Sequence, residues 1–382
     1  MPYFKHLLKD SKAPVGSLIG IYPIQGKGVV NGSSHKKLLA IGNLKQPVHA
    51  WGEIYTGISA KDYMDGTSNF YGVHSVTLYV DSVQVFNSTT DKVLPDENRM
   101  INGFTDYEEL TRTRRLIMRS YKLPGNRLRL LHPNENRGAV TIDEERDYHF
   151  RYVLEDNFGN RRTYQFIVKG KRQDIPEYKP EANEMLYWNR TNVIQKPGME
   201  LVVPRYYVYE DVPLRTDMRG DSSHIAFDYI LDAGRTPIHS YCDLSIGLRH
   251  MPVADTTKYY IVQKAGKWRS SMGGKYANGW IKTRVRSLGT FSVDVDTIAP
   301  QITPIGQGGW RTSRNIRFRI KDMESGIGSY KVYIDGKFVL FGLKKGILVI
   351  QNPEKVKKGV SHKLEVTVTD QCGNMTRKEY KF

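Results

Sequence analysis

Residues 152–170 read YVLEDNFGNRRTYQFIVKG, and residues 366–382 read VTVTDQCGNMTRKEYKF. In each stretch an alternating run of apolar and polar residues ends at an aspartate, Asp156 or Asp370, and a Gly-Asn pair follows after two intervening residues. Alternation with a period of two is typical of a β-strand with one buried face, because successive side chains leave opposite faces of the pleat. Both stretches are therefore predicted to form β-hairpins.

The similarity between these two parts of the chain extends beyond the hairpins. The segment DSKAP at 10–14 matches DTIAP at 296–300, and the block at 58–81 matches the block at 318–335. A shared opening, middle and closing hairpin indicates a repeated domain rather than a chance motif. Because the repeat is built of strands, the sequence predicts tandem β-sandwiches.

Alternating strands recur along the chain, and one hairpin has a clear turn signal. Apolar residues alternate with polar ones at 76, 78 and 80, at 316, 318 and 320, and at 364, 366 and 368. Asp335-Gly336 separates two apolar runs, and an Asp-Gly pair tolerates the positive φ angles of a type I′ turn. A tight hairpin is expected there.

The fold class predicted from these patterns is all-β, with tandem β-sandwich domains of which the outer two are immunoglobulin-like. Charged, proline-containing stretches without alternation indicate linkers at 169–183 and at 294–304. A stretch inside the first domain, at about 97–140, is expected to be an insertion between its strands. The predicted domains are 14–170, 181–295 and 297–382.

Helical signals are few. Thr105 and Glu108 have the spacing of a capping box, which predicts a short helix through Arg114. Asn352-Pro353 followed by Gly359 supplies an N-cap, a first-turn proline and a terminating glycine for one or two turns. Neither helix is long enough to organise a core, so both are expected to cross between strands.

The chain is strongly basic, with a formal net charge of +17 and a pI of about 9.6. This charge favours anionic partners such as an acidic polymer of the cell envelope, although a solvated basic surface is the plainer explanation. No helix-turn-helix, zinc-finger or RNA-recognition signature is present, so no nucleic-acid partner is expected. No apolar run reaches about 18 residues, so no membrane span is predicted. The densest basic stretch runs from Lys264 to Arg286 and contains Lys267, Arg269, Lys275, Lys282 and Arg284.

Catalytic motifs are missing from the sequence. There is no His-Glu-x-x-His, no Gly-x-Ser-x-Gly and no P-loop. His239 and Asp243 could supply two metal ligands, but a zinc site needs three or four, so a histidine at a strand edge explains the pair equally well. Cys242 and Cys372 have no nearby cysteine partner and are expected to be small buried side chains. We therefore predict no catalytic residue, no cofactor and no metal site.

Two further patterns allow alternative interpretations. Aspartates gather in turns at 62–66, at 322–326 and in the two Asp-x-x-Gly-Asn turns. Calcium needs six to eight oxygens and each turn offers two or three acidic groups, while Asp, Asn and Gly also favour tight turns on their own account. Trp268 and Trp280 form the one plausible aromatic pair for sugar stacking, although packing in or beside a core is the simpler role.

Several longer motifs resemble a known family. They are similar to the region that follows the peptidase domain in lysostaphin-type zinc metallopeptidases of Gram-negative bacteria. The motifs occur in the family's order over most of the chain: GIYPIQG (20–26), the block at 51–81, INGFTDYEEL (101–110), TIDEERDYHF (141–150), YCDLSI (241–246), RSSMGGKYANGW (269–280) and VTDQCGN (368–374). None of them is catalytic. The segment Leu201–Pro204 in addition is similar to the opening of ZU-type β modules.

The resemblance implies a role but no reactive centre. The family cuts peptidoglycan with zinc held by His-x-x-x-Asp and His-x-His motifs, and the sequence contains no His-x-His. The expectation is a non-catalytic accessory region of a cell-envelope endopeptidase, in the periplasm or envelope, with the peptidase domain and signal sequence upstream of Met1. The alternative is a stand-alone module that binds an anionic envelope glycan or a partner protein. A third alternative, a hydrolase with an unrecognised metal site, depends on His239 and Asp243 alone.

Overall fold

The computed structural model describes residues 9–221, 223–311, 313, 315–351 and 360–382. In this part of the chain nearly all regular structure is β-strand, as the alternation predicted. The chain divides into two compact units. The first contains residues 1–192, 204–213 and 233–240, and the second contains residues 193–203, 214–232 and 241–382. The three-part division drawn from the sequence stays a prediction.

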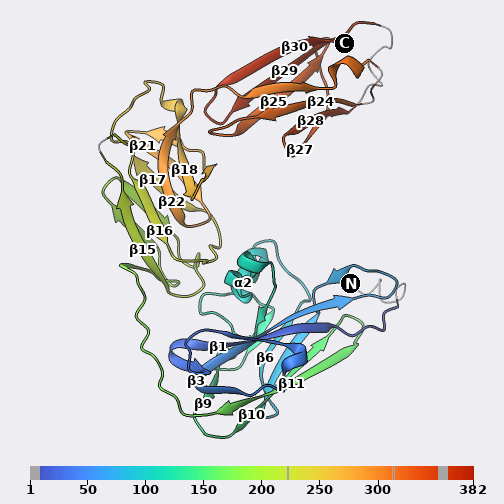
Figure 1. Ribbon diagram of the computed structural model, residues 1–382, viewed down its shortest axis with the longest axis vertical. Coiled ribbons are helices and arrows are strands. Elements are labelled where there is room, and N and C mark those ends of the chain that lie inside the picture. The colour runs from blue at the N-terminus through green and yellow to red at the C-terminus, as the bar shows by residue number, and fades with distance from the viewer. Residues whose placement is uncertain (1–8, 222, 312, 314, 352–359) are drawn as a thin grey trace. The chain divides into compact units, whose positions relative to one another are not determined.

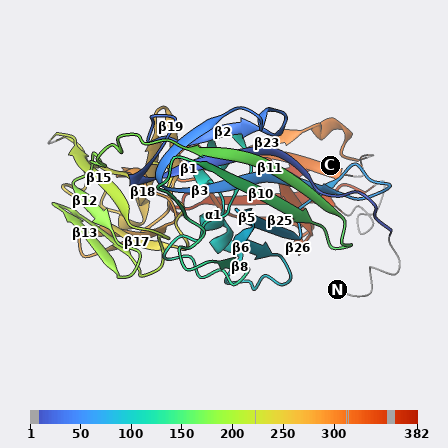
Figure 2. The same cartoon turned by 90° about the horizontal axis from the view of Figure 1, so that it is seen from below.

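The first unit is built on one large sheet with the strand order β2-β1-β3-β11-β10-β5-β6-β8, and β4, β7 and β9 also pair with β3. Most neighbours are antiparallel, but β11 runs parallel to β3. Figure 2 shows β1, β3, β11 and β10 running side by side. The strands of this sheet are β1 (Val15–Val30), β2 (Lys37–Ala40), β3 (Val48–Tyr63), β4 (Phe70–Tyr71), β5 (Ser75–Val80), β6 (Val83–Thr89), β7 (Met118–Arg119), β8 (Leu131–Pro133), β9 (Val140–Ile142), β10 (Asp147–Glu155) and β11 (Arg161–Gly170). A further strand, β12 (Glu184–Leu186), is not part of this sheet.

The core of the first unit lies on the face that the apolar pattern predicts. Val76, Leu78 and Val80 are buried along β5, whereas the residues between them are partly exposed. Tyr152 in β10 is fully buried, and its hydroxyl lies 2.7 Å from Thr56 Oγ1 and 2.8 Å from Ser120 Oγ. The alternating pattern therefore places the apolar faces of several strands against one core. The buried hydroxyl of Tyr152 forms hydrogen bonds there, as buried polar groups generally do.

The predicted insertion carries the helices of this unit. They are η3 (Asn98–Met100), α1 (Ile101–Phe104) and α2 (Tyr107–Thr113), and a further turn, η2 (Ile41–Asn43), follows β2. The capping-box helix is present as α2, but its cap is Asp106 rather than Thr105: the Asp106 carboxylate accepts the amide of Glu109 at 3.1 Å. A carboxylate is the better cap here because it also faces the positive end of the helix.

The second unit begins with a pair of sheets in which apolar residues of both are buried. One sheet includes the order β15-β16-β22-β18-β19, and the other has the order β13-β14-β17-β21-β20. Leu231 and Phe291 are buried in the first of these sheets, and Leu244 and Ile281 in the second. The strands are β13 (Asn192–Lys196), β14 (Met199–Val203), β15 (Val212–Arg219), β16 (Asp228–Asp232), β17 (Cys242–Gly247), β18 (Tyr259–Ala265), β19 (Trp268–Ser271), β20 (Lys275–Ala277), β21 (Trp280–Val285) and β22 (Gly289–Val295), with the turn η4 (Thr256–Lys258).

A second pair of sheets completes this unit. Their orders are β23-β24-β28-β27 and β26-β25-β29-β30, and Figure 1 shows β29 beside β30. Phe318, Leu348 and Val366 belong to one buried cluster that joins the two sheets. The elements are β23 (Gln301–Ile305), η5 (Gln307–Gly309), β24 (Asn315–Lys321), β25 (Ile327–Ile334), β26 (Lys337–Phe338), β27 (Phe341–Lys344), β28 (Ile347–Gln351), β29 (Lys363–Asp370) and β30 (Met375–Lys381).

Turn and proline positions in this sandwich follow backbone chemistry. Asp335 and Gly336 have φ values of 49° and 74° and join Ile334 directly to Lys337, so the type I′ hairpin is confirmed. Pro304, assigned to a linker from the sequence, instead lies within β23. That strand is at the edge of its sheet, where a residue without an amide hydrogen is tolerated. The helix predicted at Asn352–Gly359 lies outside the described residues.

Both cysteines are buried, as expected. Burial raises the pKa of Cys242 to about 12 and that of Cys372 to about 11, so both thiols are protonated at neutral pH. Within the described ranges no helix is long and apolar enough to cross a bilayer.

Candidate functional site

The basic stretch from Lys264 to Arg286 is split by the structure into two groups. Lys264 lies 2.6 Å from a carboxylate oxygen of Asp228, and Arg269 lies 2.7 Å from one of Asp294. These two cations therefore have acidic partners on the sheet that contains β18. The cations of β20 and β21 lie on the other sheet and remain as candidates for binding a ligand.

Lys275 and Lys282 are directly opposite each other in the β20–β21 pair. Ile281 and Val285 are buried, so the alternation of β21 places Lys282 and Arg284 on the exposed face. Like charges directly opposite on adjacent strands are destabilising. Among the described residues neither lysine has a carboxylate within ion-pair distance, so no acidic side chain offsets the repulsion between them.

A shallow groove of about 650 Å³ runs across this face. Its lining includes the two lysines together with Glu200, Asp243 and Arg284. Asp243 is opposite Arg284 in the register of β17 and β21. The groove therefore offers cations along β20 and β21 and carboxylates along β14 and β17, which suits a chain molecule that carries acidic groups and some amines.

An aromatic pocket of about 470 Å³ lies at one end of the same sandwich. Trp280, Phe227 and Tyr229 line it together with Arg249, whose guanidinium lies 4.1 Å from the centre of the Phe227 ring. Trp280 precedes Lys282 by two residues, so both side chains leave β21 on the same face. Such rings can stack on a sugar while the arginine binds an acidic substituent.

The predicted tryptophan pair is not assembled into one platform. Trp268 belongs to β19 in one sheet, and Trp280 belongs to β21 in the other. Trp268 is 81% exposed and does not line the aromatic pocket. The aromatic residues that line the pocket with Trp280 are Tyr229 in β16 and Phe227 just before it. No local sequence pattern indicates this grouping, because the two strands belong to different sheets.

His239 and Asp243 do not form the metal site that their spacing allowed. His239 lies in the first unit, where its Nδ1 is 3.0 Å from the Tyr209 hydroxyl, and burial lowers its pKa. Asp243 lies on the groove described above. Neither residue belongs to a group of three potential metal ligands within the described part of the chain.

Two such groups do exist, and both are built from aspartates of the repeat. One contains Asp10, Asp62 and Asp156, and the other contains Asp296, Asp322 and Asp370. The aspartate-rich turns are each local patterns, and nothing within a single turn indicates that Asp10 or Asp296 lies beside it. The repeat was the available signal, since each group takes one aspartate from the opening, one from the middle block and one from the closing hairpin.

Comparison with known families gives a match for one segment of the chain. Residues 183–296 match the model of the Zu5-like domain. The matched segment is nearly the middle domain predicted at 181–295, for which Leu201–Pro204 had suggested a ZU-type module. No curated protein matches the chain.

Solved structures give only distant similarity. A 1.5-MDa bacterial ice-binding adhesin matches at 9% identity over 86% of this chain and 89% of its own, with a TM-score of 0.15. The SGBP-B protein of the Bacteroides ovatus mixed-linkage glucan utilization locus, in complex with a mixed-linkage heptasaccharide, matches at 10% identity over 86% of this chain and 62% of its own, with a TM-score of 0.14. The human Desmocollin-1 ectodomain matches at 10% identity over 94% and 71%, with a TM-score of 0.18. At these scores none of the three supports an argument about function.

Proposed function

We propose that this chain is a non-catalytic β-sandwich module of the cell envelope that binds an acidic polymer through the groove on β20, β21, β17 and β14. The observation that carries the proposal is the direct opposition of Lys275 and Lys282 on an exposed face without an acidic partner among the described residues. An anionic group placed between the two ammonium groups would relieve their repulsion. Peptidoglycan, whose stem peptides carry carboxylates and amines, is the first polymer to test.

The test is co-sedimentation of the purified chain with isolated peptidoglycan sacculi at low and raised salt. The double variant Lys275→Glu/Lys282→Glu should bind roughly tenfold more weakly or worse, because about 1.4 kcal/mol of lost attraction is a factor of ten. Retention of the unchanged chain should fall with salt, since exposed charges are screened.

The matched control is Lys331→Glu/Lys344→Glu, which makes the same change in net charge at two exposed lysines of β25 and β27. If both double variants lose the same affinity, the binding is due to overall charge and the groove has no specific role. If the unchanged chain is not retained even at low salt, the proposal fails.

The ordered motifs at 20–26, 51–81, 101–110, 141–150, 241–246, 269–280 and 368–374 favour a more specific role. In that role the chain is the accessory region of a periplasmic or envelope peptidoglycan endopeptidase of the lysostaphin type, and it positions or regulates a peptidase domain of the same protein. The outer sandwiches are proposed to be immunoglobulin-like. The motif resemblance supports this role.

This second proposal has its own measurement. A lysostaphin-type peptidase domain should digest sacculi faster when it is fused to this chain than alone, while its activity on a short soluble peptide stays unchanged. Equal rates on sacculi for the fused and the free enzyme would contradict the accessory role. Equal rates would not bear on polymer binding by the groove, which the co-sedimentation experiment tests separately.

A further inference from the structure

Three carboxylates from distant parts of the sequence converge within the first unit. Asp10 precedes β1, Asp62 is the penultimate residue of β3, and Asp156 lies in the turn between β10 and β11. One oxygen from each lies within 4.8 Å of the others. Ligand oxygens that bind one calcium ion at 2.3–2.6 Å are separated by distances up to about 5 Å, so this spacing fits a shared cation.

The same arrangement is repeated in the last sandwich, which provides an internal comparison. Asn160 donates through its side-chain amide to the carbonyl of Asp10 at 3.0 Å and to Asp156 at 2.7 Å. Asn374 makes the equivalent bonds to the carbonyl of Asp296 at 3.0 Å and to Asp370 at 2.7 Å. The two acidic groups are therefore built on the same scaffold.

They differ at one residue. In the last sandwich Ser325 donates its amide at 3.0 Å and its hydroxyl at 2.5 Å to Oδ2 of Asp296. The equivalent position in the first unit is Asp65. The Asp65 backbone amide donates a hydrogen bond to Oδ1 of Asp10, but the Asp65 carboxylate accepts hydrogen bonds from the amide and hydroxyl of Ser11. A carboxylate cannot donate the hydrogen bond that the serine hydroxyl supplies.

This difference leaves acceptor atoms in the first unit without partners. Oδ2 of Asp10 and Oδ1 of Asp62 are buried and accept no hydrogen bond. Asp62 as a whole is only 7% exposed. Leaving a buried carboxylate oxygen without a partner is costly, and no oxygen of the other group is in this condition among the described residues.

No cationic side chain compensates the charge. Among the described residues, no lysine or arginine lies within ion-pair distance of Asp10, Asp62 or Asp156. Lys12, the nearest in sequence, contacts Asp65 instead, at 3.5 Å. Burial, together with the charges of Asp156 and Asp10, raises the pKa of Asp62 to about 6.

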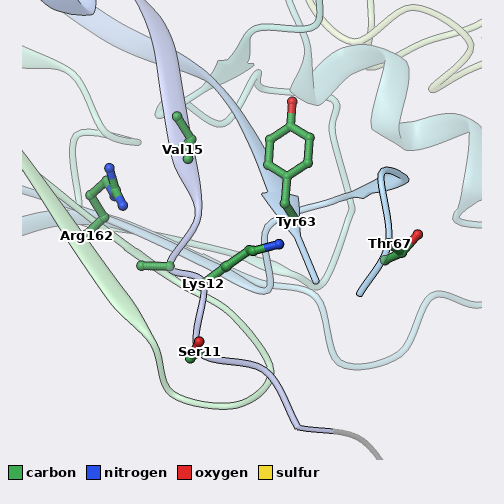
Figure 3. Close-up of a pocket in the computed structure, with 7 residues that line it drawn as sticks. Ser11, Lys12, Val15, Tyr63, Thr67 and Arg162 are labelled. Carbon is green, nitrogen blue, oxygen red and sulfur yellow. The ribbon is translucent and has the colours of Figure 1, made fainter. Parts of the chain in front are cut away.

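A pocket of about 530 Å³ is lined by residues that neighbour the acidic group in sequence, but none of the three aspartates lines it. Figure 3 shows Ser11 and Lys12 on the segment before β1, Tyr63 at the end of β3 and Arg162 on β11 around this pocket. Ser11 and Tyr63 are the immediate sequence neighbours of Asp10 and Asp62.

We propose that Asp10, Asp62 and Asp156 bind one hard divalent cation of the calcium type, with water molecules completing its coordination. The inference is independent of the polymer-binding function and concerns another part of the chain. The cation would join the segment before β1, the end of β3 and the β10–β11 turn, and so stabilise the first unit.

The test uses the full chain, stripped with EDTA and titrated with CaCl₂ by calorimetry, with MgCl₂ as the comparison. We expect saturable calcium binding, and at about one hundred times the dissociation constant a rise in the melting temperature of about 5 °C or more. Asp62→Asn should abolish one equivalent of binding and the rise in melting temperature. Asp322→Asn, the matched change in the other acidic group, should leave that equivalent intact.

Two results would overturn the proposal. The first is no saturable binding by the unchanged chain at millimolar calcium. The second is binding by Asp62→Asn with unchanged stoichiometry and affinity. Should Asp62→Asn fail to fold, Asp10→Asn at the partly exposed member is expected to show the same loss of calcium binding.

Discussion

At the scale of single residues, the contribution of a buried carboxylate to stability depends on whether it has hydrogen-bond or ion-pair partners. Asp106 caps α2, and its carboxylate also accepts a hydrogen bond from the Lys36 ammonium group at 2.8 Å. These hydrogen bonds and the charge of Lys36 keep the pKa of Asp106 below its usual range despite burial. Asp62 is the opposite case, because it is buried beside two further aspartates and has an unpartnered oxygen. The same residue type therefore contributes stability at one position and costs stability at the other.

The raised pKa of Asp62 predicts a specific pH dependence in the absence of divalent cations. The carboxyl titrates near pH 6 when folded and near 3.8 when unfolded, so between these values the folded state holds the extra proton. Stability then falls as the pH rises from about 4 to 6. Relative to the unchanged chain in EDTA, Asp62→Asn should gain stability over this window and keep the gain above pH 7.

The measurement is a series of melting temperatures from pH 4 to 8 for the unchanged chain, Asp62→Asn and Asp322→Asn. The difference between Asp62→Asn and the unchanged chain should be smallest near pH 4 and greatest above pH 7. A constant difference across the range would show that Asp62 does not titrate in this window.

At the scale of elements, the closing hairpins are tied to the segments that open each repeat. The amide of Asn374 links the β29–β30 turn to the carbonyl of Asp296 and to Asp370. Asn374→Ala removes both bonds and leaves buried acceptors with fewer partners, so we expect a loss of about 1–3 kcal/mol in the stability of the last sandwich. Asn160→Ala should do the same to the first unit.

Differential scanning calorimetry of the two variants distinguishes these effects, because each should lower a different transition. Asn136→Ala, at an exposed position in the segment before β9, is the control and should change stability by less than about 0.5 kcal/mol. If Asn374→Ala changes stability no more than this control, the hydrogen bonds between the hairpin turn and the segment that opens the repeat do not contribute measurably to stability.

How well the sequence predicted each element depended on the range of the interactions involved. Alternation located β5, β24 and β29, and Asp335-Gly336 located a hairpin, because these signals are contained in a few consecutive residues. The cap of α2 was assigned one residue too early, since Thr105 and Asp106 are both good caps and tertiary contacts with Lys36 favour the second. The acidic groups were missed because each joins aspartates that are tens of positions or more apart in the chain, and no local pattern encodes such a grouping.

At the scale of the whole chain, the basic side chains differ in whether they have acidic partners. Lysines and arginines exceed acidic residues by 57 to 40, and several of the basic side chains have acidic partners on the same sheet, as at Lys264 and Arg269. The opposed pair at 275 and 282 is therefore distinguished by its geometry and not by charge density alone. That difference is why the proposed polymer site could not be selected from the basic stretch in the sequence.

Some residues of the segment that matches the Zu5-like domain make contacts with residues outside that segment. Tyr209 belongs to the buried core cluster of the first unit, and its hydroxyl donates to the carbonyl of Arg99 at 2.8 Å. The backbone of Tyr209 also accepts the amide of Gly125 at 2.6 Å, and Arg99 donates to the carbonyl of His239 at 2.8 Å. A fragment that starts at 183 keeps Tyr209 and His239 but loses the residues that cover them.

We therefore expect a fragment of residues 183–296 to melt at a lower temperature than the same segment within a fragment of residues 9–296. Loss of burial of an aromatic core residue costs about 3–5 kcal/mol, so the effect should be large. Limited proteolysis should cut the shorter fragment within 204–213 and 233–240, and Tyr209→Ala should make the longer fragment equally sensitive there. Tyr178→Ala, at an exposed tyrosine, should not. Equal melting temperatures for the segment in both fragments would mean that it folds independently of the first unit, because the contacts of Tyr209 would then contribute nothing to its stability.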